Sequence, residues 1–234
     1  MKAEIKRSTI LLIMLSSLLL ATSASAETVE IKGYLYDLNK EGHVATLMRY
    51  NGTSTTVVIP TTIKFADVEY HVTAIHNRAF RDSKMQKYIK KLTIGDSIKV
   101  IEDNTFENCS ALSSVTFGKS ITTIGYSAFC GCSNLTSIEI PNTVTSIGGY
   151  AFYDCLSLKT IVIGNNVASI GEKAFSYCNK LNTITCLAKE VPTTDSSAFK
   201  YIKHSDITLI VYKSSIDNYK KAEPWNNFVL IKFK

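Results

Sequence analysis

The chain has 234 residues, of which 45% are hydrophobic and 20% charged, and its formal net charge is +6. This charge is too small and too scattered to form the dense basic stripe typical of nucleic-acid binding. The sequence also lacks a phosphate loop, a dinucleotide fingerprint and a G-x-S-x-G nucleophile motif, so it predicts neither an enzyme nor a cofactor-binding protein.

Residues 1–26 have the pattern of a signal peptide. A basic start is followed by an apolar run at 10–20 and by a small-residue cleavage signal at 24–26. The apolar run is short for a membrane span, although a retained anchor is the alternative. We therefore expect an exported protein, which could be secreted, displayed on the cell surface or periplasmic. The remaining residues 27–234 suffice for one structural domain.

Residues 27–70 predict an N-terminal β cap. Polar and apolar residues alternate over 30–36 and again over 44–50, with a turn at 39–42 between them. Asn51-Gly52 then predicts a hairpin. A cap is expected here because the first coil of a solenoid would otherwise expose an apolar end and an open sheet edge.

A repeat of 23 residues dominates the centre of the chain. It is clearest in three apolar columns, which contain Phe106, Phe129, Phe152 and Phe175; Cys109, Cys132, Cys155 and Cys178; and Leu112, Leu135, Leu158 and Leu181. Val57, Ile59 and Pro60 already match the end of a repeat strand, and after an insertion at 61–71 the phase resumes with Val72. A period between 20 and 29 residues with such columns predicts a leucine-rich repeat solenoid, which we expect over 71–200.

Each repeat predicts one coil with a short strand. In the unit that contains Leu135, the side chains of Ile138 and Ile140 should point inward and that of Glu139 outward. The chain should then turn at Gly148, where glycine permits a backbone conformation that other residues resist. Because a single coil cannot bury both of its sides, the strands should stack into a parallel β-sheet with short turns, 3-10 or helical segments opposite.

The motif I-G-x-x-A-F-x-x-C-x-x-L-x-x-I-x-I-P resembles the BspA-like family of bacterial leucine-rich repeats. It is complete in one unit as Ile124, Gly125, Ala128, Phe129, Cys132, Leu135, Ile138, Ile140 and Pro141. The resemblance covers nearly all of residues 27–234. It implies a secreted or surface-displayed binding protein, with adhesion to host matrix proteins or to other cells in some members, and it implies no catalytic residues.

Between Phe80 and Phe106 the spacing rises to 26, and the surplus falls at 83–88. Lysines gather in and after this loop, close to two arginines: Lys84, Lys87, Lys90, Lys91, Arg78 and Arg81. They could form a basic patch for an acidic partner. We favour the alternative, a solvated loop with scattered charge.

Residues 201–234 predict a C-terminal α/β cap, with a strand at 207–212, a short helix at 214–222 and a final strand at 228–233. Its aromatic residues, Trp225 among them, resemble the plug that covers the last coil in the BspA-like family. The alternative is that Trp225 serves as a ligand platform.

Exported chains usually form disulfides, and cysteines on neighbouring coils would lie within bridging distance. Parallel inward side chains are nevertheless poorly angled for a bridge, so the cysteine column predicts a ladder of free buried thiols. Cys130 lies outside the column and is the expected exposed thiol. The four histidines, His43, His71, His76 and His204, have no zinc-binding spacing, so no metal site is predicted.

The side chains that point outward from the coils are the remaining candidates for a functional surface. On the strands they are mostly small and polar, which predicts a flat face able to form hydrogen bonds. The turns add Tyr126, Tyr150, Tyr153 and Tyr177, and tyrosine combines a large contact area with a polar tip. These four are the candidate partner-binding residues, unless their rings only pack over the edges of the coils.

The sequence therefore predicts a monomeric, non-catalytic binding module that recognises an extracellular protein or glycan. It predicts no cofactor, no nucleic-acid partner and no transmembrane segment after the signal peptide. The alternative is a structural or assembly component of the cell envelope without a dedicated ligand.

Overall fold

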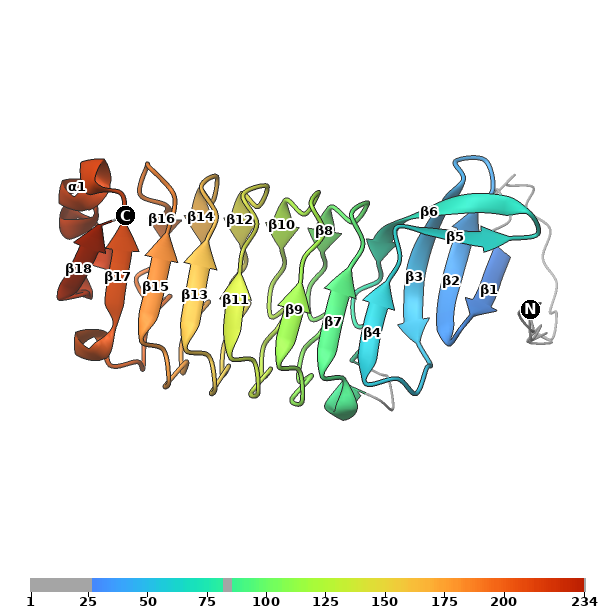
Figure 1. The fold of residues 1–234 in the computed structure, drawn as a ribbon, viewed down its shortest axis with the longest axis horizontal. Helices are drawn as coiled ribbons and strands as arrows, with labels where there is room; N and C mark the ends of the chain where they lie inside the picture. Colours follow the sequence, from blue (N-terminus) through green and yellow to red (C-terminus); the bar gives the residue numbers. More distant parts are fainter. Residues whose placement is uncertain (1–26, 82–85, 234) are drawn as a thin grey trace, which may run out of the picture.

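The computed structural model describes residues 27–81 and 86–233. The predicted signal peptide and Lys84 lie outside the described residues. The described chain is a β-solenoid of about eight turns with little helix, in which short strands stand side by side along one axis (Figure 1). This confirms the leucine-rich repeat solenoid predicted from the sequence, while the domain boundaries stay predictions.

One long face of the solenoid carries the principal strand of each coil. Neighbouring strands are parallel within a three-stranded group, β4-β7-β9, and a five-stranded group, β11-β13-β15-β17-β18. Their bounds are β4 Thr56–Ile59, β7 Lys91–Ile94, β9 Ser114–Thr116, β11 Ser137–Glu139, β13 Thr160–Ile163, β15 Thr183–Cys186, β17 Thr208–Val211 and β18 Leu230–Phe233. Ile138 pairs in register with Ile161, and both are buried while Glu139 is exposed, as the alternation predicted.

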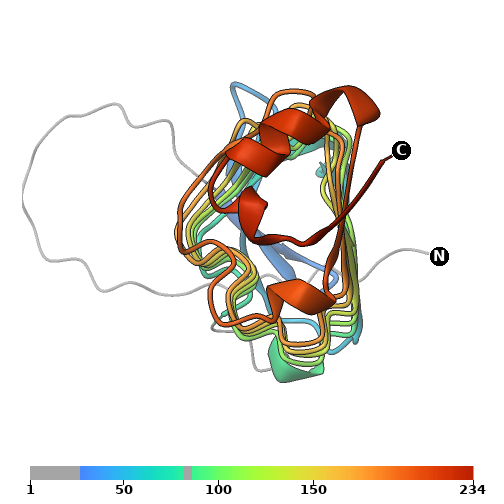
Figure 2. The ribbon, with the colours of Figure 1, turned by 90° about the vertical axis from the view of Figure 1, so that its left-hand side faces the viewer.

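A second sheet consists of two-residue strands in the order β16-β14-β12-β10-β8. These are β8 Val100–Ile101, β10 Thr123–Ile124, β12 Ser146–Ile147, β14 Ser169–Ile170 and β16 Thr193–Thr194. Seen along the axis, the coils overlay one another closely (Figure 2). The strict 23-residue period produces this overlay, because Ile124, Ile147 and Ile170 occupy the same place in successive coils.

The interior contains two continuous rows of side chains. From Phe80 to Phe199 the six phenylalanine rings stack with adjacent centroids 4.8 to 5.6 Å apart, and Tyr50 extends the row at one end. The four column cysteines are fully buried beside them, and all six cysteines are free, as predicted. The Cys155 thiol donates to the Phe129 carbonyl at 3.4 Å, so it has a hydrogen-bond partner within the core.

The sequence predicted that glycine is needed at position 148 because of its backbone conformation, and this physical reason was wrong. Gly148 does not have a positive φ, but an added Cβ would lie 2.6 Å from the carbonyl carbon of Gly125 in the preceding coil. Gly171 is equally crowded, with the Gly149 nitrogen at 2.5 Å. The glycine column is therefore required because adjacent backbones approach closely, not because the chain needs an unusual conformation.

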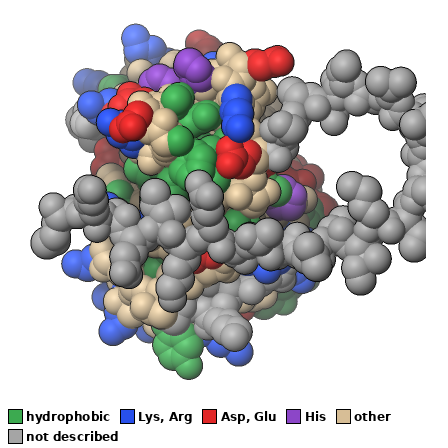
Figure 3. Space-filling view, turned by 90° about the vertical axis from the view of Figure 1, so that its right-hand side faces the viewer, with side chains coloured by type: hydrophobic (Ala, Val, Ile, Leu, Met, Phe, Trp, Pro, Cys, Tyr) green, Lys and Arg blue, Asp and Glu red, His purple; other side chains and the backbone are tan. Residues whose placement is uncertain are grey.

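The N-terminal segment forms a separate sheet in the order β1-β2-β3-β6-β5. Its strands are β1 Glu27–Ile31, β2 Tyr34–Asn39, β3 Val44–Tyr50, β5 Thr62–Phe65 and β6 Val68–Ile75. It lies at the amino-terminal end of the solenoid (Figure 1), where an end-on view shows hydrophobic side chains gathered between charged ones (Figure 3).

Two sequence predictions for this segment were wrong. The expected strand over 30–36 is interrupted by a turn at Lys32 and Gly33, both with positive φ. Asn51-Gly52 makes no hairpin, because the chain runs on into β4, which pairs with β7. Gly52 instead leaves room for the Tyr50 ring, whose hydroxyl donates to the Ser54 carbonyl at 3.0 Å.

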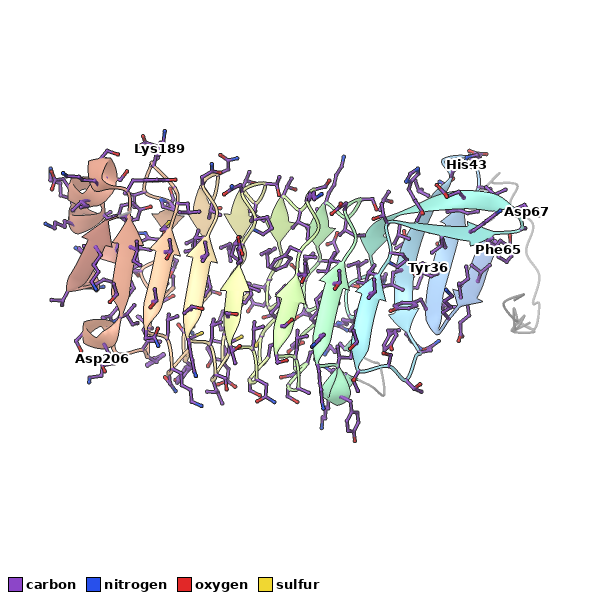
Figure 4. The ribbon with its side chains drawn as sticks, in the orientation of Figure 1. Tyr36, His43, Phe65, Asp67, Lys189 and Asp206 are labelled. Carbon is purple, nitrogen blue, oxygen red and sulfur yellow. The ribbon has the colours of Figure 1, made fainter. Side chains whose placement is uncertain are left out.

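The insertion at 61–71 is the greater part of an antiparallel hairpin of β5 and β6. The hairpin turns at Ala66 and Asp67, both left-handed. Phe65 and Asp67 lie at its tip, and Tyr36 lies closer to the solenoid (Figure 4). The predicted return to the repeat phase is confirmed, because Val72 is fully buried in the core.

The C-terminal segment contains the single α-helix of the described residues, α1 Ile216–Lys221, between short 3-10 turns. These turns are η2 His204–Asp206, η3 Lys213–Ser215 and η4 Trp225–Asn227, and a further turn, η1 Gln86–Tyr88, precedes β7. Trp225 is fully buried against Phe199, with ring centroids 5.2 Å apart, and its indole donates to Thr194 Oγ1 at 3.0 Å. Trp225 is therefore a core residue, and its interpretation as a ligand platform was wrong.

Candidate functional site

Five tyrosines form a continuous row on the outside of the solenoid. Adjacent ring centroids are 5.3 Å apart from Tyr126 to Tyr150, 5.2 Å from Tyr150 to Tyr153, 5.2 Å from Tyr153 to Tyr177 and 4.6 Å from Tyr177 to Tyr201. The structure thus brings together all four candidate residues. We call these five residues the tyrosine row.

The row crosses the coils diagonally, because its members come from four different positions of the repeat. Tyr150 lies one position further along its coil than Tyr126 does in the preceding coil. Tyr153 lies on the same coil as Tyr150, and the row then steps to Tyr177 and Tyr201 on the next two. Tyr126 and Tyr201 at the two ends are 45% and 59% exposed, while the three inner tyrosines are half-buried.

Sequence reasoning missed Tyr201. The repeat spacing there lengthens to 24, which places Tyr201 outside a strict 23-residue alignment with Tyr177. A search that allowed the one-residue insertion would have found it, because it follows Phe199 by two positions as Tyr177 follows Phe175.

Three members of the row have left-handed backbone conformations: Tyr150 has φ 57°, Tyr177 φ 60° and Tyr201 φ 60°. Most coils have two such positions, and the residue type there changes from coil to coil. The first position contains Arg78, Asn104, Ser127, Tyr150 and Lys173, and the second contains Asn108, Gly131, Asp154, Tyr177 and Tyr201. Asparagine, aspartate and glycine tolerate this region, whereas a bulky aromatic residue there is strained. Such strain is a reason to suspect function.

Lys173 fixes the middle of the row. Its ammonium donates to the Tyr150 hydroxyl at 2.8 Å and lies 5.1 Å from the centroid of the same ring. The hydrogen bond to Tyr150 raises the pKa of Lys173, so the group stays charged at physiological pH. Desolvation raises the pKa of Tyr126 and Tyr153, and nearby tyrosines contribute, so these hydroxyls stay neutral. The row therefore presents neutral hydroxyls beside one fixed cation.

The strand face beside the turns is flat and polar, as predicted. Ser114, Ser137 and Thr160 are exposed on successive strands, and Ser137 and Thr160 are paired in register. The alternation of the strands places these residues outward, and in this column serine or threonine recurs from one coil to the next. The irregular tyrosine row is for that reason the stronger candidate.

The basic residues around residue 88 form no joint site in the described structure. Arg81 pairs with Glu107 at 3.1 Å, while Lys87, Lys90 and Lys91 are exposed. Residues 82–85 of the predicted loop lie outside the described residues, so the choice between a solvated loop and a binding patch stays a prediction.

Within 27–81 and 86–233, no three His, Cys, Asp or Glu side chains gather into a possible metal site. The six thiols are also unsuited to chemistry at neutral pH. Desolvation raises the pKa of Cys109 to about 12 and that of the half-buried Cys130 to about 11. Cys130 is thus partly accessible, as expected, but is not a reactive thiolate.

Comparison with known protein families supports the repeat pattern independently of the structure. The profile of the BspA type leucine rich repeat region matches in 6 copies, over residues 60–182 and 99–222. The chain belongs to the BspA-type leucine-rich repeat family. Proteins of this family are generally non-catalytic and are associated with the bacterial surface, which indicates a binding or repeat module.

Solved structures share the fold of this BspA-type chain. The pneumococcal vaccine antigen PcpA superposes with a TM-score of 0.66 at 22% identity, over 82% of this chain and 52% of the antigen. A leucine-rich repeat protein from Bacteroides ovatus gives 0.58 at 20% identity, over 87% and 67% of the two chains. One from Bacteroides capillosus gives 0.50 at 29%, over 57% and 96%. This chain spans about half of the length of PcpA.

No curated protein matches the chain by sequence. No helix within the described residues has the length and apolar character needed to cross a membrane.

Proposed function

We propose that this protein is an exported, monomeric binding module that recognises an extracellular protein through the tyrosine row. The observation that carries the proposal is the placement of Tyr150, Tyr177 and Tyr201 at left-handed backbone positions. Asparagine or glycine accepts this conformation at lower cost, and other coils have Asn104, Asn108 and Gly131 there. The row lies on the surface and costs folding stability, and recognition of a partner explains why the tyrosines are there.

A protein partner fits the row better than a glycan does. Tyr150, Tyr153 and Tyr177 each contact two neighbouring rings, which leaves little free ring face on which a sugar could stack. Ring edges and hydroxyls remain available, and tyrosine is enriched at the energetic centres of protein interfaces. Adhesion to host matrix proteins, or contact with other cells, is the form of this function that we expect.

The test replaces Tyr177 and Tyr201 with asparagine. Asparagine accepts the left-handed conformation, so Tyr177→Asn and Tyr201→Asn should leave the thermal midpoint unchanged or raise it. Capture of matrix proteins in a pull-down should fall about tenfold or more, because buried tyrosine contacts dominate such interfaces. The matched control is Tyr88→Asn, since Tyr88 is 60% exposed and outside the row.

Retained capture by the double variant would contradict the proposal, as would equal loss in the Tyr88 control. A glycan array run with the same variants separates the two partner classes. Light scattering over a range of concentrations addresses the alternative of an envelope assembly component. A constant mass supports the monomer, and growth with concentration supports assembly.

A further inference from the structure

A groove of about 550 Å³ lies between the N-terminal sheet and the first solenoid strand, well away in sequence from the tyrosine row. Its apolar lining comes from Ile31, Tyr34, Tyr36 and Ile63 of the N-terminal segment and from Val58 and Pro60 at β4. Its volume lies within the range of roughly 300–1,000 Å³ that is usual for small-molecule sites.

Val58 is the exposed apolar residue of the groove lining. Val58, Thr93 and Thr116 are paired in register on three successive strands, and all three point outward. The same outward column contains Val162 and Ile210 in later coils, but these two are half-buried, whereas Val58 is 51% exposed. Together with Tyr34 and Pro60, Val58 makes a contiguous apolar lining, which favours an apolar ligand.

The backbone of β4 is not free to bind an extended peptide. The Val58 N–H donates to the Tyr34 hydroxyl at 3.1 Å, and the Thr56 N–H donates to Ser54 Oγ at 3.1 Å. Pro60 has no N–H to offer. Peptides that add to a sheet edge depend on such main-chain hydrogen bonds. A ligand must therefore be recognised by its apolar body and its charge.

The charge of the groove is positive. Lys32 and Lys64 are among its lining residues, which include no carboxylate. Lys64 does pair with Asp67 at 3.5 Å, but the two side chains are 67% and 98% exposed. Water and salt screen so exposed a pair, so it leaves the lysine available to an anion.

We propose that this groove binds an amphipathic anion, namely an acyl chain that ends in a carboxylate. The chain would lie against Val58, Pro60 and Ile63, and the carboxylate would lie near Lys32 and Lys64. This site is separate from the tyrosine row and does not depend on its function.

The test uses three probes with the same chain below their micelle concentrations: dodecanoate, dodecanol and dodecyltrimethylammonium. Titration calorimetry with the purified protein should show one site for dodecanoate, with binding at least about tenfold weaker for the neutral and cationic probes. Raising the salt concentration should weaken only dodecanoate binding. Equal binding of all three probes, or no binding of dodecanoate, would overturn the proposal.

Matched variants assign the site. Val58→Thr recreates the residue of the neighbouring strands and should weaken dodecanoate binding about fivefold. Val162→Thr, the same change on the outward face of β13, should have no effect. Lys32→Asn with Lys64→Gln should weaken binding about tenfold, and Lys159→Gln should not.

Unchanged affinity in the groove variants would overturn the proposal. Tight binding of an acidic, apolar heptapeptide in place of dodecanoate would overturn it in favour of a peptide site.

Discussion

The interior phenylalanine row and the surface tyrosine row run through the same coils and differ in how the repeat produces them. The phenylalanines occupy a single repeat position, and the Phe152 ring is within 1° of parallel to the rings of Phe129 and Phe175. The tyrosines come from four positions, and their rings tilt by 23° to 69°. The stacking of identical coils produces the phenylalanine row. It does not explain the tyrosine row, whose members differ in repeat position from coil to coil.

The largest expected effect is on the regular row. Phe152→Ala removes a fully buried ring from between two parallel neighbours and should lower the free energy of unfolding by about 3–5 kcal/mol. The adjacent surface change Tyr153→Ala should cost less than about 1 kcal/mol. Urea denaturation measures both, and similar losses would mean that the tyrosine row is part of the wall.

Gly148→Ala tests the close approach of the coils. The added methyl would meet the Gly125 backbone, so the coils must shift, at a cost of about 1–3 kcal/mol in the free energy of unfolding. Gly42→Ala is the matched control, because its nearest atom would be 3.5 Å away. Equal thermal midpoints for the two variants would show that backbone contact does not fix the coil spacing.

The thiol ladder should be inert in the folded protein. At pH 8, iodoacetamide should modify at most Cys130 in the native state and all six cysteines in denaturant. Desolvation raises the pKa of Cys132 and Cys155 well above the ordinary 9.0. The unfolded chain therefore loses these protons first, and stability should fall as the pH rises above about 9. Modification of two or more thiols in the native state would contradict the buried ladder.

The smallest expected effect on stability belongs to Lys173→Met. The variant removes the cation from Tyr150, and its thermal midpoint should stay within error of the parent. Partner capture should nevertheless fall several-fold, because the Tyr150 ring loses the contact that orients it. Loss of stability without loss of capture would make Lys173 a structural residue only.

Much of the solenoid could be predicted because its determinants are local and repeated. The spacing of Phe129 and Phe152 predicted the coil, and the alternation around Glu139 predicted the strand. The prediction of a hairpin at Asn51-Gly52 was wrong because β4 pairs with β7, a strand much later in the chain, and this pairing outweighs the local turn signal. The turn at Lys32 and Gly33 was missed because only one glycine marked it.

The sequence predicted which residues belong to the candidate site but not how they are arranged. The four tyrosines could be named from the sequence, but their contact with one another depends on a shift of one repeat position between neighbouring coils. The contacts of Tyr201 and Lys173 with the row depend on the stacked coils, where residues 23 or 24 apart in sequence become neighbours.

The sequence by itself determined the coil, its period and its dry interior, because each repeat carries the same apolar residues at the same spacing. Only the tertiary structure decided which glycines are crowded, which tyrosines touch and where a groove remains beside the first strand. These features arise between coils or between the solenoid and the N-terminal sheet, where distances are set by packing and not by order along the chain.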